Sequence, residues 1–300
     1  MLILAPTHEL AIQIGELVGK VGDAMKVVWR ACYGGTDVHG DIEALSEGVQ
    51  VVVGTLGRVY DMLSHGRLEA QLVKLVVVDD ADMLGLKKYR HHFNYIMDEM
   101  PEKAQIAFVS TTFPEKFKKF ALSYMSNPMK IPESLPNLLP KNVSQYFIPL
   151  THNEDRLPTF LSLLSQLQGR KVLVFCKSIS PEFNSKLLST DLEIHFHHAE
   201  MSQSLREKAI SAFRKKGSIV LVNSGLLARG LDVADIAVVV LYELGSAVEY
   251  VHCVGRGGRY GSRGVAVSLA NEADEKFLRN VGRRHRVSIR ELPEERAGLW

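Results

Sequence analysis

Cysteine is scarce in this sequence. The three cysteines among 300 residues, Cys32, Cys176 and Cys253, lie far apart, and no Cys-x-x-Cys pair occurs. This distribution argues against a disulfide framework and a zinc site, and it favours a reducing compartment. No apolar run is long enough to cross a membrane and no N-terminal signal is visible, so we expect no membrane association and a cytoplasmic or nuclear protein. The net charge is only +2, so any nucleic-acid surface must be a local stripe.

A phosphate-binding loop, Gly-x-x-x-x-Gly-Lys-Ser/Thr, is also missing from these residues. The nearest approach, Gly15–Val21, has its glycines one residue too close and ends in valine. Yet Asp79-Asp80-Ala81-Asp82 directly follows the apolar run Leu75–Val78. Carboxylates at the C-terminal end of a buried parallel strand commonly hold Mg²⁺ beside phosphates. Asp79 is the natural Mg²⁺ carboxylate, and Asp80 is placed to orient or deprotonate water. An ordinary capped helix start remains the alternative.

Short β-type runs alternate with helical patterns such as Thr159–Leu167 and Leu205–Phe213. One series of strands is expected at 2–5, 26–31, 49–53, 75–79 and 105–109, and a second at 143–148, 171–176, 193–196, 218–222, 236–241 and 265–269. This alternation predicts an α/β protein with two doubly wound parallel sheets in tandem. Three prolines between Ile131 and Pro140 favour a linker there. We therefore expect a first domain at 1–131, a linker at 132–141 and a second domain at 142–300.

Two arginines in the second half point to phosphate chemistry. Arg256 and Arg259 stand three residues apart among glycines, after the segment Leu227–Asp232. Two such guanidinium forks can be aimed at one phosphate, where they would stabilise the charge of a transition state. A glycine-rich turn with solvated arginines is the alternative that composition leaves open.

Two expected helix starts have the features of anion sites. One helix opens at Pro6-Thr7-His8, and another opens at Thr55-Leu56-Gly57-Arg58, in each case after a strand. Threonine and the free N–H groups of a helix N-terminus suit a phosphodiester oxygen, and Arg58 adds charge. Either segment alone would be read as an ordinary N-cap.

Taken in order, these segments resemble the motifs of the DEAD-box RNA helicases along essentially the whole chain. The matching segments are 6–13, 34–35, 55–58, 79–82, 110–112, 174–176, 198–206, 223–232 and 252–259. Within that family the likeness is greatest to the translation initiation factor 4A group, through stretches such as Val52–Thr55, Asp61–Leu63 and Ser288–Pro293. The resemblance implies two RecA-like domains, the first of them incomplete at its N-terminus.

The resemblance also implies roles for individual residues. The expected contacts to the RNA backbone come from Thr7, Gly35, Thr55, Gly57, Arg58, Gln203 and Arg206. Asp79 would hold Mg²⁺ through water, Asp232 would bind the ribose of ATP, and Arg256 and Arg259 would act on the γ-phosphate. Ser110 and Thr112 would couple hydrolysis to domain closure. Backbone contacts read strand shape rather than base sequence, so the implied partner is single-stranded or structured RNA of any sequence.

The chain departs from the family pattern mainly near the chemistry. The Q motif and motif I are not found, the motif II glutamate is Asp80, and the first motif VI arginine is Cys253. Further departures are His8, Leu56, Thr111 and Gly225. Without the phosphate-loop strand, Gln105–Val109 should form an apolar edge of the first sheet.

Two functions follow as hypotheses. The first is an ATP-dependent RNA helicase that acts as a monomer, with translation initiation as its expected process and a scaffold protein as its expected partner. The second is a degenerate, non-catalytic descendant that binds RNA or a protein.

Several other residues have a structural interpretation. His195 and His197 share a strand face, but the sequence offers no third metal ligand at a suitable spacing. We expect His91 and His92 to be solvated, the run Arg283–Arg286 to be a solvated helix end, and Tyr89, Phe93 and Ile96 to be core.

Overall fold

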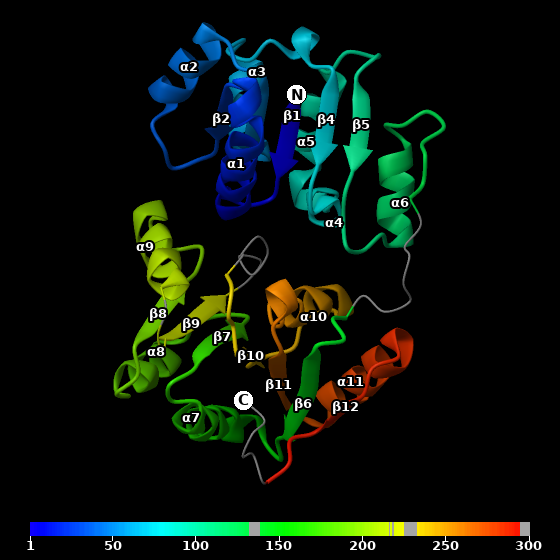
Figure 1. Cartoon of the computed structure of the whole chain (residues 1–300). Helices are drawn as coiled ribbons and strands as arrows, with labels where there is room; N and C mark the ends of the chain where they lie inside the picture. The colour runs from blue at the N-terminus through cyan, green and yellow to red at the C-terminus, as the bar shows by residue number, and fades with distance from the viewer. Residues whose placement is uncertain (132–138, 216, 218, 225–232, 295–300) are drawn as a thin grey trace. The chain divides into compact units, whose positions relative to one another are not determined.

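The structure, a computed structural model, describes residues 1–131, 139–215, 217, 219–224 and 233–294. The chain forms two compact units, Met1–Pro132 and Glu133–Trp300. Each unit is built on one parallel sheet with helices on its faces (Figure 1). This agrees with the α/β architecture of two parallel sheets that the alternating pattern predicted.

The sheet of the first unit has the order β2-β3-β1-β4-β5. Its strands are β1 (Leu2–Ala5), β2 (Trp29–Cys32), β3 (Val51–Thr55), β4 (Leu75–Val78) and β5 (Gln105–Phe108). The helices are α1 (His8–Gly22), α2 (Val38–Glu47), α3 (Leu56–Ser64), α4 (Ala81–Leu84), α5 (Arg90–Asp98) and α6 (Glu115–Leu122), with 3-10 turns η1 (Asp23–Met25), η2 (Ala70–Leu72) and η3 (Lys87–Tyr89). Since all strands are parallel, their carboxyl ends lie at one edge of the sheet, where ligands of doubly wound folds bind.

Apolar side chains on both faces hold this sheet in place. One face packs under α1 through Ile3, Val51 and Val53, and the other packs under α3, α5 and α6. The strands β1 and β3 are buried along their whole length, which is why their sequences are nearly continuous runs of Val, Leu and Ile. Phe93 and Ile96 are fully buried in the core between the sheet and helices α3, α5 and α6, as the helical spacing predicted.

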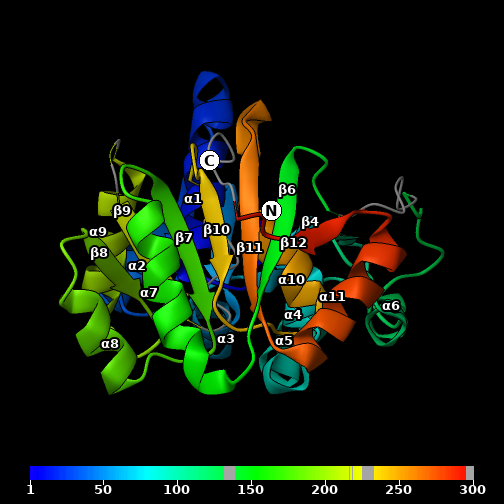
Figure 2. The ribbon, with the colours of Figure 1, turned by 90° about the horizontal axis from the view of Figure 1, so that it is seen from below.

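The sheet of the second unit has the order β12-β6-β11-β10-β7-β9-β8. Its strands are β6 (Val143–Pro149), β7 (Lys171–Cys176), β8 (Ile194–His197), β9 (Ile219–Ser224), β10 (Val238–Leu241), β11 (Gly264–Ala270) and β12 (Ile289–Glu291). The helices are α7 (Arg156–Gln166), α8 (Pro181–Leu188), α9 (Gln203–Arg214), α10 (Ala247–Val254) and α11 (Glu272–His285), with 3-10 turns η4 (Asn153–Asp155) and η6 (Arg259–Gly261). Figure 2 shows β7, β10, β11 and β6 side by side in this order. One face packs on α7 and α8, and the other on α9, α10 and α11.

Two details of the fold differ from the expectation. The strand β2 begins at Trp29 rather than Lys26, because Lys26 adopts a left-handed conformation (φ 54°) that closes the turn after α1. The short strand β12 was not expected, since its largely exposed residues form no apolar run. The remaining strands agree with their expected positions to within two residues. The prediction for Gln105–Val109 is confirmed, since β5 is an outer strand among the described residues.

The histidines of β8 have ordinary structural contacts. Nε2 of His195 lies 3.1 Å from a carboxylate oxygen of Glu193. His197 is buried, and its Nδ1 lies 2.6 Å from the side-chain oxygen of Asn223. These contacts favour the structural interpretation of the pair over a metal site.

Candidate functional site

A cavity of about 570 Å³ opens in the first unit, at the carboxyl ends of its strands. Three segments that the sequence singled out meet there: the start of α1, the paired glycines after β2 and the start of α3. The lining residues from these segments are Pro6, His8, Gly34, Thr55, Leu56, Gly57 and Arg58. The fold therefore brings together three expected RNA-contacting segments, whose lining residues lie up to 52 positions apart in the chain, from Pro6 to Arg58.

Two helix N-termini contribute to this cavity. Thr7 is the N-cap of α1, and its side chain accepts a hydrogen bond from the N–H of Leu10 over 3.3 Å. Thr55 is the N-cap of α3, and its hydroxyl forms no capping bond. Because the first N–H groups of a helix have no partner within the helix, the start of α3 can offer them to an anion. The two N-cap threonines thus differ: the Thr7 side chain forms a capping hydrogen bond and the Thr55 side chain does not.

Gly57 stands at the second position of α3, where glycine is unfavourable. It is exposed, and a Cβ added there would meet no atom within 4 Å. Glycine in a helix interior costs up to about 1 kcal/mol relative to alanine, so helix propensity does not favour this residue, and packing does not require it. Glycine at such a position leaves room for close approach to the backbone at the cavity.

The loop after β2 is held next to the start of α1. The His8 and Tyr33 rings have their centroids 5.5 Å apart. A Cβ built on Gly34 would lie 3.5 Å from Nε2 of His8. Gly35 has φ 81°, a conformation that favours glycine, so the loop needs this residue to turn. Gly35 therefore shapes the wall of the cavity beside Gly34.

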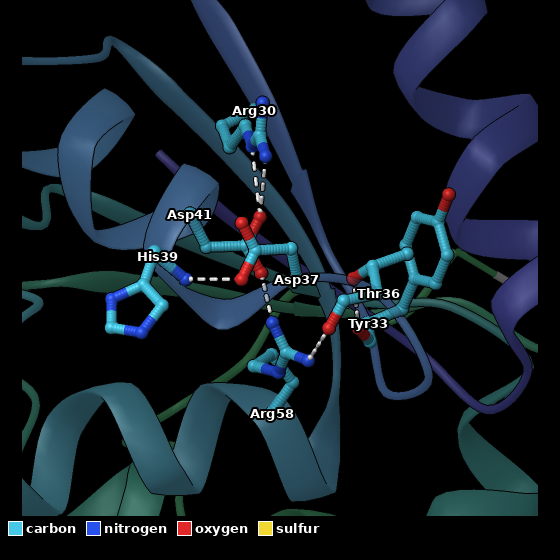
Figure 3. Close-up of polar contacts among 7 residues, drawn as sticks. All are labelled: Arg30, Tyr33, Thr36, Asp37, His39, Asp41 and Arg58. Atoms are coloured by element: carbon cyan, nitrogen blue, oxygen red, sulfur yellow. Dashed lines mark hydrogen bonds and ion pairs between the residues drawn. The ribbon is translucent and has the colours of Figure 1, made fainter.

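Arg58 takes part in an ion-pair cluster, which Figure 3 shows in detail. Its Nη1 contacts Oδ2 of Asp41, and its Nη2 donates to the carbonyl oxygen of Thr36 over 2.9 Å. Arg30 donates from Nε to Oδ1 of the same carboxylate over 2.9 Å. The expected RNA contact Arg58 is thus engaged with two groups of its own unit. Sequence analysis did not single out Asp41 or Arg30.

The rest of the cavity lining comes from Asp61 of α3 and from residues after the acidic tetrapeptide, namely Leu84, Lys88, Tyr89 and His92. Tyr89 lines the cavity and is half-buried against the core of the first unit, so the expectation that it is core is only partly confirmed. The ammonium of Lys88 lies 4.5 Å from the centre of the Tyr89 ring. His92 is half-buried with its ring 4.6 Å from that of Tyr60, so the expectation that it is solvated was wrong.

The acidic tetrapeptide follows β4 as expected. Oδ1 of Asp79 accepts a hydrogen bond from the N–H of Asp80 over 2.9 Å. Asp80 itself is left-handed (φ 43°), a conformation that aspartate tolerates better than most residues but at some cost. Burial raises the pKa of the Asp79 carboxyl above its ordinary value, the Asp80 N–H lowers it and the Asp80 charge raises it. A nearby cation would stabilise the ionised form of such a buried carboxyl.

Asp82 joins the end of β4 to the end of β5. Its Oδ1 accepts the hydroxyl of Ser110 over 2.9 Å, and its Oδ2 accepts the hydroxyl of Thr112 over 2.6 Å. Asp82 and Thr112 are both buried, so these charge-assisted bonds are sheltered from water. Sequence analysis named Ser110 and Thr112 but gave Asp82 no role, because nothing local shows which carboxylate they bind.

In the second unit the two arginines follow α10. Arg256 donates from Nε to the carbonyl oxygen of His252, and Arg259 donates from Nε to that of Gly255, each over 3.2 Å. Asn142 donates to the carbonyl oxygens of Gly258 and Ser262, which fixes the turn that carries Arg259. Both guanidinium groups are therefore held by backbone at the end of one helix.

Gln203 and Arg206, the remaining expected RNA contacts, lie in the first turn of α9. Ser202 caps this helix by accepting from the N–H of Leu205 over 3.4 Å, and Gln203 donates to Glu207 over 2.9 Å. Asp232, expected to bind ribose, and Gly225 lie outside the described residues.

Comparisons with known proteins agree with this arrangement. Residues 1–120 match the family model "DEAD/DEAH box helicase", and residues 155–261 match "Helicase conserved C-terminal domain". The chain is 35% identical over 301 aligned residues to "ATP-dependent RNA helicase eIF4A" of Coccidioides immitis, covering 99% of this chain and 76% of that protein. The chain belongs to the DEAD-box helicase family. The family resemblance inferred from the motifs is confirmed.

Solved structures show the same fold as this DEAD-box chain. "S. cerevisiae Dbp5 bound to RNA and ADP BeF3" has a TM-score of 0.89 at 23% identity, covering 99% of this chain and 78% of that one. Mss116p bound to ssRNA and AMP-PNP has a TM-score of 0.83 at 21% identity, covering 99% and 64%. Two tandem RecA-like helicase domains are thereby shown. Among the described residues of this DEAD-box chain, no helix has the length and apolar character needed to span a membrane.

Membership of the DEAD-box family implies ATP and Mg²⁺, and the residues present fit these two unequally. Asp79, a carboxylate whose pKa is raised by burial, is a suitable oxygen donor for Mg²⁺ or its bound water. Asp82 is engaged by two hydroxyls. The sequence Gly-x-x-x-x-Gly-Lys-Ser/Thr, whose backbone N–H groups would cradle the phosphates of ATP, does not occur among these 300 residues. The described residues thus supply a ligand for the metal, and a phosphate loop is not among them.

Proposed function

We propose that this DEAD-box chain binds single-stranded RNA through the sugar–phosphate backbone, without regard to base sequence. The observation that carries the proposal is Gly57, a glycine that packing does not require, at an exposed helix start inside the cavity. Thr55 and the N–H groups of the first turn of α3 would meet one phosphate. In the first unit Thr7 and Gly35 would also contact the RNA backbone and Arg58 would border that contact, and in the second unit Gln203 and Arg206 would bind it.

ATP-driven remodelling of RNA is the activity proposed for the family's full machinery. It is supported by the Asp82 bridge, which ties the tetrapeptide to Ser110 and Thr112, the residues proposed to couple hydrolysis to closure. Asp79 would hold Mg²⁺, and Arg256 and Arg259 would neutralise charge on the phosphates. When bound, the metal would supply charge neutralisation. Asp232 is proposed for the ribose.

A non-catalytic RNA- or partner-binding protein is the second candidate. It is favoured by Asp80, which is one methylene shorter than the family's glutamate, since a displacement of about 1 Å can lower a rate on the order of 100-fold. A role in translation initiation with a scaffold protein, and a cytoplasmic location, are proposed only from the 35% identity with the eIF4A relative.

Two measurements on the 300-residue protein separate these candidates. The first is fluorescence anisotropy with a labelled single-stranded oligo-uridylate and with its DNA counterpart. The second is phosphate release from Mg·ATP with and without RNA. RNA binding without turnover supports the second candidate, and RNA-stimulated turnover that Asp79→Ala abolishes supports the first. Absence of RNA binding, or equal binding of RNA and DNA, would refute the proposal of RNA recognition.

A further inference from the structure

A buried carboxylate lies at the centre of the cluster beside the cavity. The side chain of Asp41, on α2, is only 1% exposed. Arg30 reaches its Oδ1 with Nη2 at 2.8 Å as well as with Nε at 2.9 Å, and Arg58 reaches its Oδ2. A buried carboxylate without partners would be strongly unfavourable, so these contacts explain why it can be inside.

Both terminal nitrogens of the Arg58 guanidinium group have protein partners. One nitrogen contacts Asp41 and the other donates to the carbonyl oxygen of Thr36 over 2.9 Å. The Arg58 side chain is 9% exposed, in contrast with 37% for Arg30. A phosphate that bound Nη1 and Nη2 together would compete with these two contacts, and a buried charge that loses a partner is costly.

The Thr36 carbonyl belongs to the loop that carries the paired glycines. The Thr36 hydroxyl donates to the carbonyl oxygen of Tyr33 over 2.9 Å, which closes the loop on itself. Asp37 then caps α2 by accepting from the N–H of His39 over 3.0 Å. Arg58 therefore links the start of α3 to this loop from outside, as Figure 3 shows.

We propose that Asp41 is a positioning residue for RNA binding and that Arg58 acts through it. Asp41 holds the Arg58 fork against Thr36, so the loop Tyr33–Asp37 and the start of α3 form one preorganised wall of the cavity. The phosphate contacts come from backbone and hydroxyl groups of that wall rather than from the Arg58 fork. The inference rests on the proposed function, RNA binding at this cavity.

Asp41 can affect RNA affinity in two opposite ways. By simple electrostatics, removal of a negative charge beside a phosphate site should tighten RNA binding. By the proposed positioning role, loss of the Asp41 carboxylate should weaken RNA binding, because Arg58 would no longer hold the loop Tyr33–Asp37 in place. Asp41→Asn keeps the shape of the side chain and removes the charge, so it separates the two effects. Asp61→Asn is the matched control, since Asp61 lines the same cavity but its ion-pair partner is the exposed His65.

RNA affinity is measured for the full chain by anisotropy with a labelled oligo-uridylate between about 50 and 200 mM salt. We expect Asp41→Asn to bind about tenfold more weakly, as for loss of one charge-assisted hydrogen bond, and Asp61→Asn to bind somewhat more tightly. Tighter binding by both variants would overturn the proposal. Thermal melting checks that each variant is folded.

Arg58→Lys supplies a second, independent variant that leaves Asp41 paired with Arg30. Lysine keeps a charge for a phosphate but cannot bridge two acceptors with a fork. We expect Arg58→Lys to lose about tenfold in affinity, nearly as much as Arg58→Ala, with the slope of affinity against salt unchanged. If Arg58→Lys binds like the parent while Arg58→Ala lowers the slope by about one, Arg58 is a phosphate ligand and the proposal is wrong.

Hydrogen exchange of the RNA-free protein separates failure of this inference from failure of the proposed function. Asp41→Asn and Arg58→Lys should both raise exchange of the amides in Tyr33–His39, with helices of the second unit unchanged. Unchanged exchange in this segment refutes the positioning role even if RNA binds. Raised exchange in a chain that binds no RNA supports the positioning role and refutes the proposed function alone.

Discussion

Thr112 donates its hydroxyl hydrogen to Oδ2 of Asp82 over 2.6 Å, although thirty positions separate the two residues in the chain. The parallel pairing of β4 with β5 makes this contact possible, because it brings the carboxyl ends of both strands to one edge. Ser110 binds the other oxygen of the same carboxylate. The acidic tetrapeptide and the segment after β5 are therefore one hydrogen-bonded unit.

Thr112→Val should destabilise the first unit by about 1–3 kcal/mol, because the shape is kept while the buried Asp82 carboxylate loses a donor. Urea unfolding of the full chain, followed by a probe in the first unit, measures the change. Thr151→Val, on an exposed loop of the second unit, is the matched control and should shift stability by less than about 0.5 kcal/mol. Equal effects of the two variants would show that the Asp82 bridge contributes little.

Gly57→Ala should stabilise the first unit by about 0.5–1 kcal/mol, because alanine favours the helix and its Cβ meets open space. The same methyl group should obstruct RNA and weaken its binding about tenfold. Thermal melting and anisotropy measure the two changes. Gly66→Ala is unsuitable as a control because its φ of 63° is strained for alanine, whereas Ser64→Ala, exposed in the last turn of α3, should leave RNA affinity as it is. Gly57→Ala with undiminished RNA binding would contradict the proposed site.

Asp79→Asn should raise the melting temperature at neutral pH. Burial raises the folded-state pKa of Asp79, so the folded protein holds this proton more tightly than the unfolded chain does. The stability contributed by Asp79 is therefore fully present at acid pH and is lost as the pH rises through the folded-state pKa. Asparagine resembles the protonated form and can still accept from the N–H of Asp80. The advantage of the variant should shrink towards about pH 3, and a variant less stable than the parent at pH 7 would contradict this account.

The two units should differ in stability, with residues 1–131 melting below residues 142–300 when each is studied alone. The five-stranded sheet ends in β5, whose next residue, Val109, is 51% exposed, whereas the second sheet has seven strands. A higher melting temperature for 1–131 would refute the expected order.

An apolar outer strand also favours pairing between chains. Val109→Lys should therefore reduce concentration-dependent aggregation of the full chain, measured by light scattering.

The strands could be predicted because their local patterns are strong. Runs such as Leu75–Val78 and Lys171–Cys176 are Val-rich and lie between turn residues, and the structure places a strand at each. The prediction failed where non-local contacts decide. Lys26 closes a turn although its neighbours Val27 and Val28 look strand-like, and β12 pairs with β6 although its own residues are mostly exposed. His92 was misjudged because its packing partner Tyr60 comes from another helix.

The sequence by itself determined the order of the motifs, the alternation of strands and helices, and which residues end up at helix starts, because these depend on neighbours along the chain. Only the tertiary structure decided which of those residues share a site and which partner each one takes. Arg58 illustrates the difference: its sequence context suggests a phosphate contact, whereas the fold places the buried Asp41 and the Thr36 carbonyl within its reach. A buried charge must be paired wherever packing places it, and no local pattern states which partner will be there.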